Sequence, residues 1–325
     1  MYRFPKAEIE QDRPIQSFPA LSMTSPRAGP SLTPSLTPPL KSLFAQTTRL
    51  PVVPKVAQAL IQSLGKIDVA VGAISAQIGA DPVISAKILR LANSAYFRAS
   101  RTIASIDGAV QMLGFAMVRN LVVGCSMIDA FQKVPGLDLP RFWRCSVATA
   151  CAARWLAQQT DEDADLAFTV GLMHGLGQLV LHTVVPDVMI AIDARSDPLA
   201  WERARVERDH LQYDYADVSA ELALSWKFPE AVAAQLREVT DPLRAAAPSP
   251  VASWVHVGAW RARAAILAWT PEEIERTCPL AVGRALHRPF QWLEQEATLA
   301  GEEPAAMGVM PPIGRLTEGL DLMLT

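Results

Sequence analysis

The sequence predicts an all-α protein built from many short, closely spaced helices. Apolar residues recur at helical spacing along most of the chain, as they do at Ile67, Val71, Ile74 and Ile78. From about residue 43 onward, no run of alternating apolar and polar residues is long enough to indicate a β-strand. Half of the 325 residues are hydrophobic, which is sufficient for a substantial buried core.

The first 42 residues differ in composition from the rest of the chain. The stretch Ser25–Pro39 is dense in proline, serine and threonine. Such a composition buries too little apolar surface to offset the conformational entropy lost on ordering. We therefore expect residues 1–42 to be a disordered tail. The alternative is a peptide that a partner protein docks.

Residues typical of helix ends mark the boundaries of the helices that follow. Asp81 can accept hydrogen bonds from free amides at a helix start, and Pro82 suits the first helical position. Ser105 fits the cap of the next helix, which Gly114 ends. Further helices are expected over residues 118–125, 142–156, 166–185, 201–210, 217–226, from 229 onward, 251–268, 271–276 and 289–300.

The central segment 166–186 has no charged residue and is long enough to raise the question of a membrane span. It contains three glycines, among them Gly175 and Gly177, together with His174 and His182. It ends directly in Pro186, with no basic or aromatic flank. We expect a buried central helix that breaks around the glycines, and no membrane span.

The charge balance argues against a dedicated nucleic-acid-binding protein. Lys and Arg total 30, Asp and Glu total 33, and no basic domain or stripe stands out. The densest arginine cluster is interleaved with Glu202 and Glu207, and comprises Arg203, Arg205 and Arg208. This pattern favours a solvated helix face over a phosphate-binding patch. The N-terminus lacks the apolar region of a secretory signal, so a cytoplasmic protein is expected.

Several phrases of the sequence resemble one family of bacterial signalling domains. The phrases are Leu50–Pro54, Asp81–Phe97 (DPVISAKILRLANSAYF), Ile103–Gly114, Phe142–Trp143, Gly171–Gly177 (GLMHGLG), Glu207, and Trp226–Pro229. In their order, their spacing and the identity of their residues, these motifs are similar to those of the HDOD family, the HD-related output domain. The resemblance implies an all-helical domain related to the metal-dependent HD phosphohydrolases. It predicts an HDOD domain over residues 43–245, with 246–325 as a helical C-terminal extension whose end is weakly ordered.

The metal ligands of the HD phosphohydrolases are largely missing from the matching positions. Their His-Asp dipeptide corresponds to His174-Gly175, and glycine offers no side-chain ligand. A further upstream histidine of the family falls near Cys145, and another falls at about Tyr215. A histidine pair falls at about 239–240, where the chain has Val-Thr. We therefore predict no catalytic residue, no metal and no cofactor, with His174 left as a hydrogen-bonded core residue.

The end of the predicted helix that starts at Pro82 offers a candidate contact site. Its members are Asn93, Ser94, Tyr96, Lys87 and Arg90. Small polar groups there can contact a ligand or partner, and nearby basic residues, with Arg98 and Arg101, can pair with a phosphorylated ligand. The plainer interpretation is a helix end beside a solvated face.

The sequence thus predicts a non-catalytic regulatory module of bacterial signal transduction that acts by binding a protein or a small ligand. A nucleotide or cyclic dinucleotide is the small ligand considered. The alternative is a metal-dependent phosphohydrolase with an atypical ligand set, acting on phosphodiesters or nucleotides. The identity of the protein partner is left open.

Overall fold

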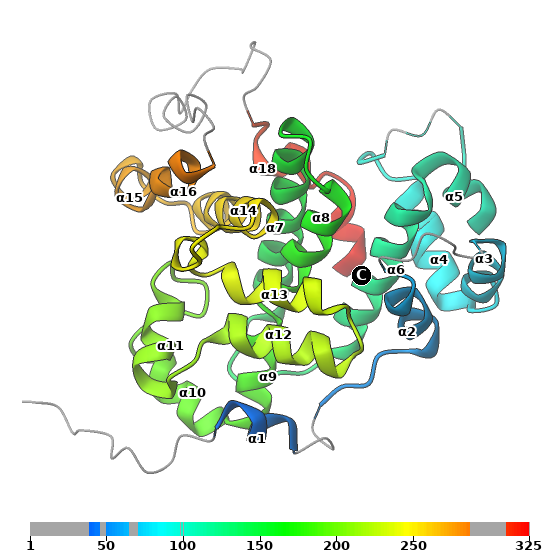
Figure 1. Cartoon of the computed structure of the whole chain (residues 1–325). Coiled ribbons are helices and arrows are strands. Elements are labelled where there is room, and N and C mark those ends of the chain that lie inside the picture. The colour runs from blue at the N-terminus through cyan, green and yellow to red at the C-terminus, as the bar shows by residue number, and fades with distance from the viewer. Residues whose placement is uncertain are drawn as a thin grey trace, which may run out of the picture. The chain divides into compact units, whose positions relative to one another are not determined.

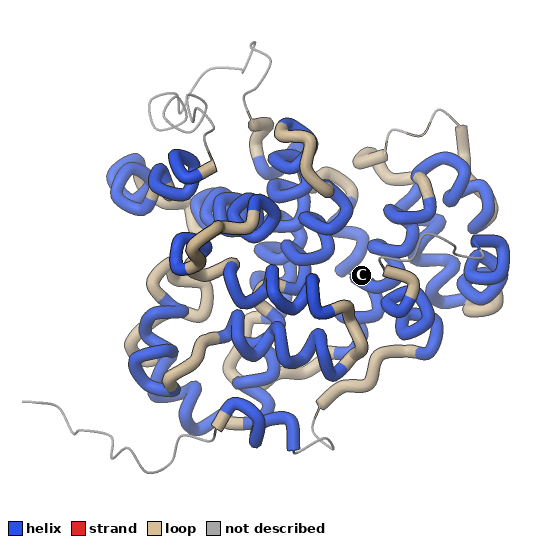
Figure 2. The backbone as a smooth tube through the Cα atoms, in the orientation of Figure 1, coloured by secondary structure: helices blue, strands red, loops and turns tan. Residues whose placement is uncertain are grey.

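The computed structural model describes residues 39–45, 50–64, 71–97, 99, 101–286 and 310–324. In these ranges the regular structure is helical throughout, as Figure 2 shows, which confirms the predicted fold class. The N-terminal helices are α1 (Leu40–Ala45), α2 (Lys55–Gln62), α3 (Val71–Gly79), α4 (Pro82–Ala92), α5 (Ile106–Leu113) and α6 (Phe115–Ala130). The central helices are α7 (Leu139–Gln159), α8 (Ala164–Met173), α9 (Leu176–Val184), α10 (Pro186–Asp193), α11 (Arg203–Leu211), α12 (Tyr215–Ser225) and α13 (Glu230–Glu238). The C-terminal elements are η2 (Pro242–Arg244), α14 (Pro250–Ile266), α15 (Pro271–Thr277), α16 (Leu280–Ala285), α18 (Ile313–Leu316) and η3 (Leu320–Leu324).

Local capping explains where several of these helices begin and end. Asp81 accepts hydrogen bonds from the amides of Val83 and Ile84, and thereby caps α4. Ser105 accepts from the amide of Gly108 at the start of α5, and Gly114, with φ 82°, ends that helix. Each of these assignments confirms the boundary expected from the sequence.

Helix α7 is the centre of the core, because α8 and α14 both pack closely along it (Figure 1). The close approach depends on small residues. A Cβ atom at Gly171 of α8 would lie 2.7 Å from Ala150 Cα, and one at Gly258 of α14 would lie 2.9 Å from Ala153 N. Larger side chains at these two positions would therefore push α8 or α14 away from α7.

The central segment breaks at its glycines, as predicted. Helix α8 ends at Met173 and α9 begins at Leu176, with His174 and Gly175 between them. The whole stretch Ala164–Val184 has the length and mean hydropathy of a membrane span, but 83% of an apolar 18-residue section of it is buried inside the protein. The bent pair α5–α6, with 120° between its helices, passes the same test only when it is taken as one span.

The two ends of the chain differ in part from expectation. Helix α1 begins at Leu40, inside the segment predicted as tail, because Leu43 is buried in the core. Residues 1–38 and the helix expected over 289–300 lie outside the described residues. At the C-terminus, η3 packs on α4, α6 and α7 and buries Leu320 and Met323 completely.

The arginine cluster of α11 is not the solvated face that its charge pattern suggests. Arg203 and Glu207 are both 0% exposed, and Arg203 Nε lies 2.7 Å from Glu207 Oε1. Arg203 Nη2 also lies 2.7 Å from Asp193 Oδ1. Only Arg205 is largely exposed. The prediction is therefore wrong for Arg203 and Glu207, because α10 and α12 cover their side of the helix.

Candidate functional site

The residues at the expected metal-ligand positions gather around one arginine. His174 lies at the break between α8 and α9, Cys145 on α7, and Tyr215 at the start of α12. We refer to these three residues as the remnant site. The side chain of Arg263, from α14, enters among them and donates from Nη2 to the phenol oxygen of Tyr215 at 3.2 Å.

Arg263 is held in place by neutral partners. Its Nε donates to the carbonyl oxygen of Leu199 at 3.0 Å, and its Nη1 to that of Ala259 at 3.3 Å. The guanidinium also lies 5.8 Å from the centre of the Trp201 ring. Arg263 is only 4% exposed, and within the described residues it forms no ion pair with a carboxylate. The part of the chain that the structure describes therefore buries this positive charge without a counter-ion.

The electrostatics of the remnant site follow from burial and from this charge. Burial, followed by the charge of Arg263, lowers the pKa of His174 to about 3, although the Gly171 carbonyl raises it. The histidine is therefore neutral, with Nδ1 donating to that carbonyl oxygen at 2.6 Å. Burial opposes the charge of Arg263, but Tyr215 and Cys145 raise its pKa above the ordinary value. Arg263 accordingly remains protonated.

These residues do not fit a metal ion. In the described part of the chain, no group of three or more His, Cys, Asp or Glu residues is placed to hold one. Burial raises the pKa of the Cys145 thiol, which disfavours the thiolate that binds metals. Gly175 contributes no ligand, and a Cβ there would lie 3.1 Å from the Phe142 ring. A guanidinium occupies the centre of the group and would repel a cation.

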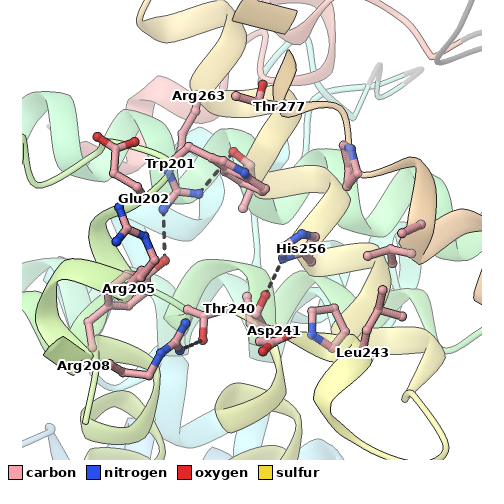
Figure 3. Close-up of a pocket in the computed structure, with 18 residues that line it drawn as sticks. Trp201, Glu202, Arg205, Arg208, Thr240, Asp241, Leu243, His256, Arg263 and Thr277 are labelled. Carbon is pink, nitrogen blue, oxygen red and sulfur yellow. Dashed lines mark hydrogen bonds between the residues drawn. The ribbon is translucent and has the colours of Figure 1, made fainter. Parts of the chain in front are cut away.

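A pocket of about 410 Å³ opens beside Arg263 (Figure 3). Tyr215 of the remnant site also lines it, so the pocket adjoins that site and reaches the buried guanidinium. Arg205 and Arg208 of α11 line another part of its wall. The pocket walls also carry Trp201, Glu202, Thr240, Asp241, Leu243 and His256.

The polar groups of the pocket differ in how far they are already paired. Arg208 Nη1 bonds Asp214 Oδ2 and also lies 3.3 Å from Thr240 Oγ1. Arg205 is 68% exposed and lies 3.5 Å from Asp209, a pair of little strength in water. His256 donates from Nδ1 to the carbonyl oxygen of Val239 at 2.7 Å.

Acid is expected to destabilise the protein through two neutral histidines, the buried His174 and the half-buried His256. Burial lowers the pKa of His256 to about 4 and contributes to the pKa of about 3 at His174, against 6.5 for a free histidine. The unfolded chain therefore takes up protons first as the pH falls. The stability contributed by each group is present above pH 6.5 and is lost as the pH falls toward its folded pKa.

The measurement is urea unfolding at several pH values, for the wild type and for His256→Asn, which keeps a donor for Val239. Below pH 6.5 the wild type is expected to lose about 1.4 kcal/mol more per pH unit than the variant. Equal slopes for the two proteins would contradict the expectation.

The contact site predicted at the end of α4 lies apart from the pocket. Asn93 joins the end of α4 to the following loop, because it donates to Ile103 O and accepts from Ile103 N, both at 2.8 Å. Lys87 pairs with Asp129 of α6 at 2.7 Å, and Arg90 donates to Leu322 O of η3 at 2.8 Å.

The two remaining members of that predicted site also face other parts of the protein. Ser94 is buried against Gly319. A Cβ atom added at Gly319 would lie 2.8 Å from the Cβ atom of Ser94. Tyr96 is half-buried, and its hydroxyl interacts with Arg154 and Cys151 of α7. Each of the five residues thus has a contact within the protein, and their role toward a ligand or partner stays a prediction.

Sequence reasoning missed the residues that define the pocket. Arg263, Trp201 and His256 were not among the candidates, and Arg208 belonged to a supposed solvated face. One local clue was present, because Arg263 stands within the strongly apolar helix α14. Its partners Leu199 and Tyr215, however, are 64 and 48 residues away in the sequence.

The comparisons with known proteins agree with the fold. A family model for the HDOD domain matches residues 50–242. A protein from Shewanella amazonensis named as a putative phosphohydrolase is 26% identical, with a TM-score of 0.67, and the match covers 87% of this chain and 98% of that one. An HDOD domain protein of unknown function from Geobacter sulfurreducens is 20% identical, with a TM-score of 0.62 and coverage of 80% and 93%.

One curated relative also matches. An uncharacterized protein of Treponema pallidum is 24% identical over 190 residues, which is 58% of this chain. The matched part spans 37% of the length of that relative.

Proposed function

The chain belongs to the HDOD family, and on this basis we propose that it is a non-catalytic regulatory module that acts by binding. The observation that carries the proposal is the buried guanidinium of Arg263 within the remnant site. A metal-dependent hydrolase needs convergent ligands around a cation that polarises a phosphoryl oxygen and supplies hydroxide. In this protein the cation is the Arg263 side chain, and its neighbours are the neutral side chains of His174, Cys145 and Tyr215.

We further propose a role in bacterial signal transduction, a protein partner and a cytoplasmic location, because the resemblance to the HDOD family implies them. The pocket beside Arg263 gives the module a place where a small ligand can bind and alter what the surface offers to a partner.

The alternative function is a phosphohydrolase with an atypical ligand set. It is favoured by the likeness to the Shewanella amazonensis protein, at 26% identity over 87% of this chain. The two functions differ in metal content, which can be measured directly.

Metal content is the first test of the proposal. The full chain, purified without chelator or a histidine tag, is expected to carry iron, manganese and zinc far below one ion per chain. It is also expected to hydrolyse neither phosphodiesters nor nucleotides. Stoichiometric metal, or hydrolysis that His174→Ala abolishes, would favour the phosphohydrolase.

Restoring the lost carboxylate alone is not expected to restore metal binding. Gly175→Asp supplies one ligand beside His174, but Cys145 and Tyr215 stay protonated and Arg263 stays positive. Its side chain must also displace the ring of Phe142, 3.1 Å from the new Cβ. Thermal unfolding of this variant with and without manganese or zinc is expected to give the same midpoint. A midpoint raised by metal would show a ligand set more complete than these residues suggest.

A further inference from the structure

The uncompensated charge of Arg263 points to an anion in the pocket. A buried ion costs several kcal/mol unless it is paired. Among the described residues the other buried arginine is paired, because Arg203 lies 2.7 Å from both Glu207 and Asp193. Arg263 has two carbonyls, a phenol and the Trp201 ring as partners, which solvate the guanidinium without neutralising it.

The guanidinium also has bonding capacity left for a ligand. Arginine has five N–H donors, and three donor atoms of Arg263 each have one protein acceptor. Since Arg263 lines the pocket, an anionic ligand there can reach the remaining hydrogens.

A second arginine favours a phosphate group over a carboxylate. Arg205 and Arg208 line the same pocket and lie on its α11 side (Figure 3). Arg208 is already paired with Asp214, whereas the ion pair that Arg205 forms within the described residues is exposed and 3.5 Å long, so Arg205 can turn to a ligand. A phosphate monoester carries about −1.5 to −2 charges and three acceptor oxygens, so it can satisfy more than one guanidinium. Glu202 and Asp241 in the wall limit the total negative charge that the pocket accepts.

The rest of the wall suits an organic body attached to the phosphate. Leu243, Val282 and Pro279 supply apolar surface, and Trp201 lies 4.9 Å, centre to centre, from the ring of His256. His256 is neutral, because burial lowers its pKa to about 4, so it can face an uncharged ring. The pocket volume of about 410 Å³ falls in the range of small-molecule sites.

We propose that this pocket binds a small phosphate monoester with an aromatic body, of the nucleoside 5′-monophosphate class, whose phosphate neutralises Arg263. The inference rests on the proposed non-catalytic binding function and names its ligand class. The ligand is bound and not consumed. Binding supplies the counter-ion that the described residues do not provide, and ties α11 to α14 across the pocket.

The test is calorimetric titration of the full chain with adenosine 5′-monophosphate, adenosine and inorganic phosphate. The monophosphate is expected to bind at least roughly tenfold more tightly than adenosine or inorganic phosphate. Adenosine lacks the phosphate that pairs with the arginines, and inorganic phosphate lacks the aromatic body that packs on the apolar wall. Adenosine binding as tightly as its monophosphate would overturn the role of Arg263. No binding of the monophosphate would overturn the ligand class.

Paired variants locate the site without disturbing the core. Ala281 is exposed and lines the pocket, so Ala281→Trp is expected to abolish binding. Its control is Ala76→Trp, at an exposed residue of α3, which is expected to leave binding unchanged. Arg205→Gln is expected to weaken binding roughly tenfold, and the exposed Arg144→Gln to leave it unchanged. Equal affinity for all four variants would place the ligand elsewhere and overturn the inference.

The two proposals can fail separately. Each titrated sample is assayed for free phosphate afterwards. Binding of the monophosphate without phosphate release supports both proposals. Release of phosphate that Ala281→Trp abolishes would refute the non-catalytic function, while the ligand class would stand. Absence of both binding and release would refute the ligand class and leave the non-catalytic function intact.

Discussion

Replacing Gly177 with alanine is expected to cost at least about 3 kcal/mol of unfolding free energy, which is at the upper end for overpacking. Helix α9 meets α12 at this residue, and a Cβ atom there would lie 2.0 Å from Tyr215 O and 2.9 Å from Ser219 N. Both neighbours are backbone atoms, so no side-chain rotation relieves the clash. The two helices must separate, and the hydrogen bond from Gly177 N to Ser219 Oγ, 2.7 Å long, is strained or lost.

Gly72→Ala is the matched control for this substitution. Gly72 is also a helical glycine, but its added Cβ would meet nothing within 4 Å. Alanine there is expected to leave stability unchanged or to raise it by about 0.5–1 kcal/mol, because glycine is a poorer helix former. Chemical unfolding of the two variants in parallel is the measurement. Similar stabilities would show that α9 and α12 can move apart at little cost.

The second large effect is expected at Arg263. Arg263→Ala removes three hydrogen bonds and leaves the carbonyl of Leu199 and the hydroxyl of Tyr215 without this donor. It also opens a cavity beside the remnant site. Loss of the unpaired charge offsets part of this cost. We expect the free energy of unfolding to fall by roughly 2–4 kcal/mol. The exposed Arg144→Ala is expected to change it by less than about 0.5 kcal/mol.

A change in the titration of His174 separates the charge of Arg263 from its packing. Arg263→Met keeps most of the side-chain volume and removes the charge. The pKa of His174 is then expected to rise from about 3, because the second of its two lowering causes is gone, while burial keeps it below 6.5. Titration of the histidine ring by NMR is the measurement. An unchanged pKa, or a more stable Arg263→Ala protein, would contradict the central place given to this guanidinium.

The helix boundaries could be predicted from the sequence because their causes are local. Asp81, Ser105 and Gly114 each form hydrogen bonds with backbone groups only a few residues away, so these caps can be recognised in a single sequence. The break between α8 and α9 has the same character, since it coincides with the His174-Gly175 pair. The family resemblance is likewise carried by short phrases of adjacent residues, and the HDOD match over residues 50–242 agrees with it.

The candidate site could be predicted only in part. The sequence pointed to Cys145 and Tyr215 as positions where metal ligands are missing, and to His174 as the histidine that remains. It did not indicate what fills the space between them. Arg263 comes from a helix that lies beyond the predicted domain end at 245, and α14 packs against α7 only in the folded chain.

The helical class, the capped helix ends, the family and the absence of a side-chain ligand at Gly175 all follow from the amino-acid sequence. Which charges are buried depends instead on how the helices pack. Arg203 and Glu207 look solvated in the pattern of α11, yet both are fully covered in the folded protein. Arg263 acquires its partners from Leu199 and Tyr215, far away along the chain. The physical reason is that capping depends on neighbours in sequence, whereas desolvation of a charge depends on every element that packs against it.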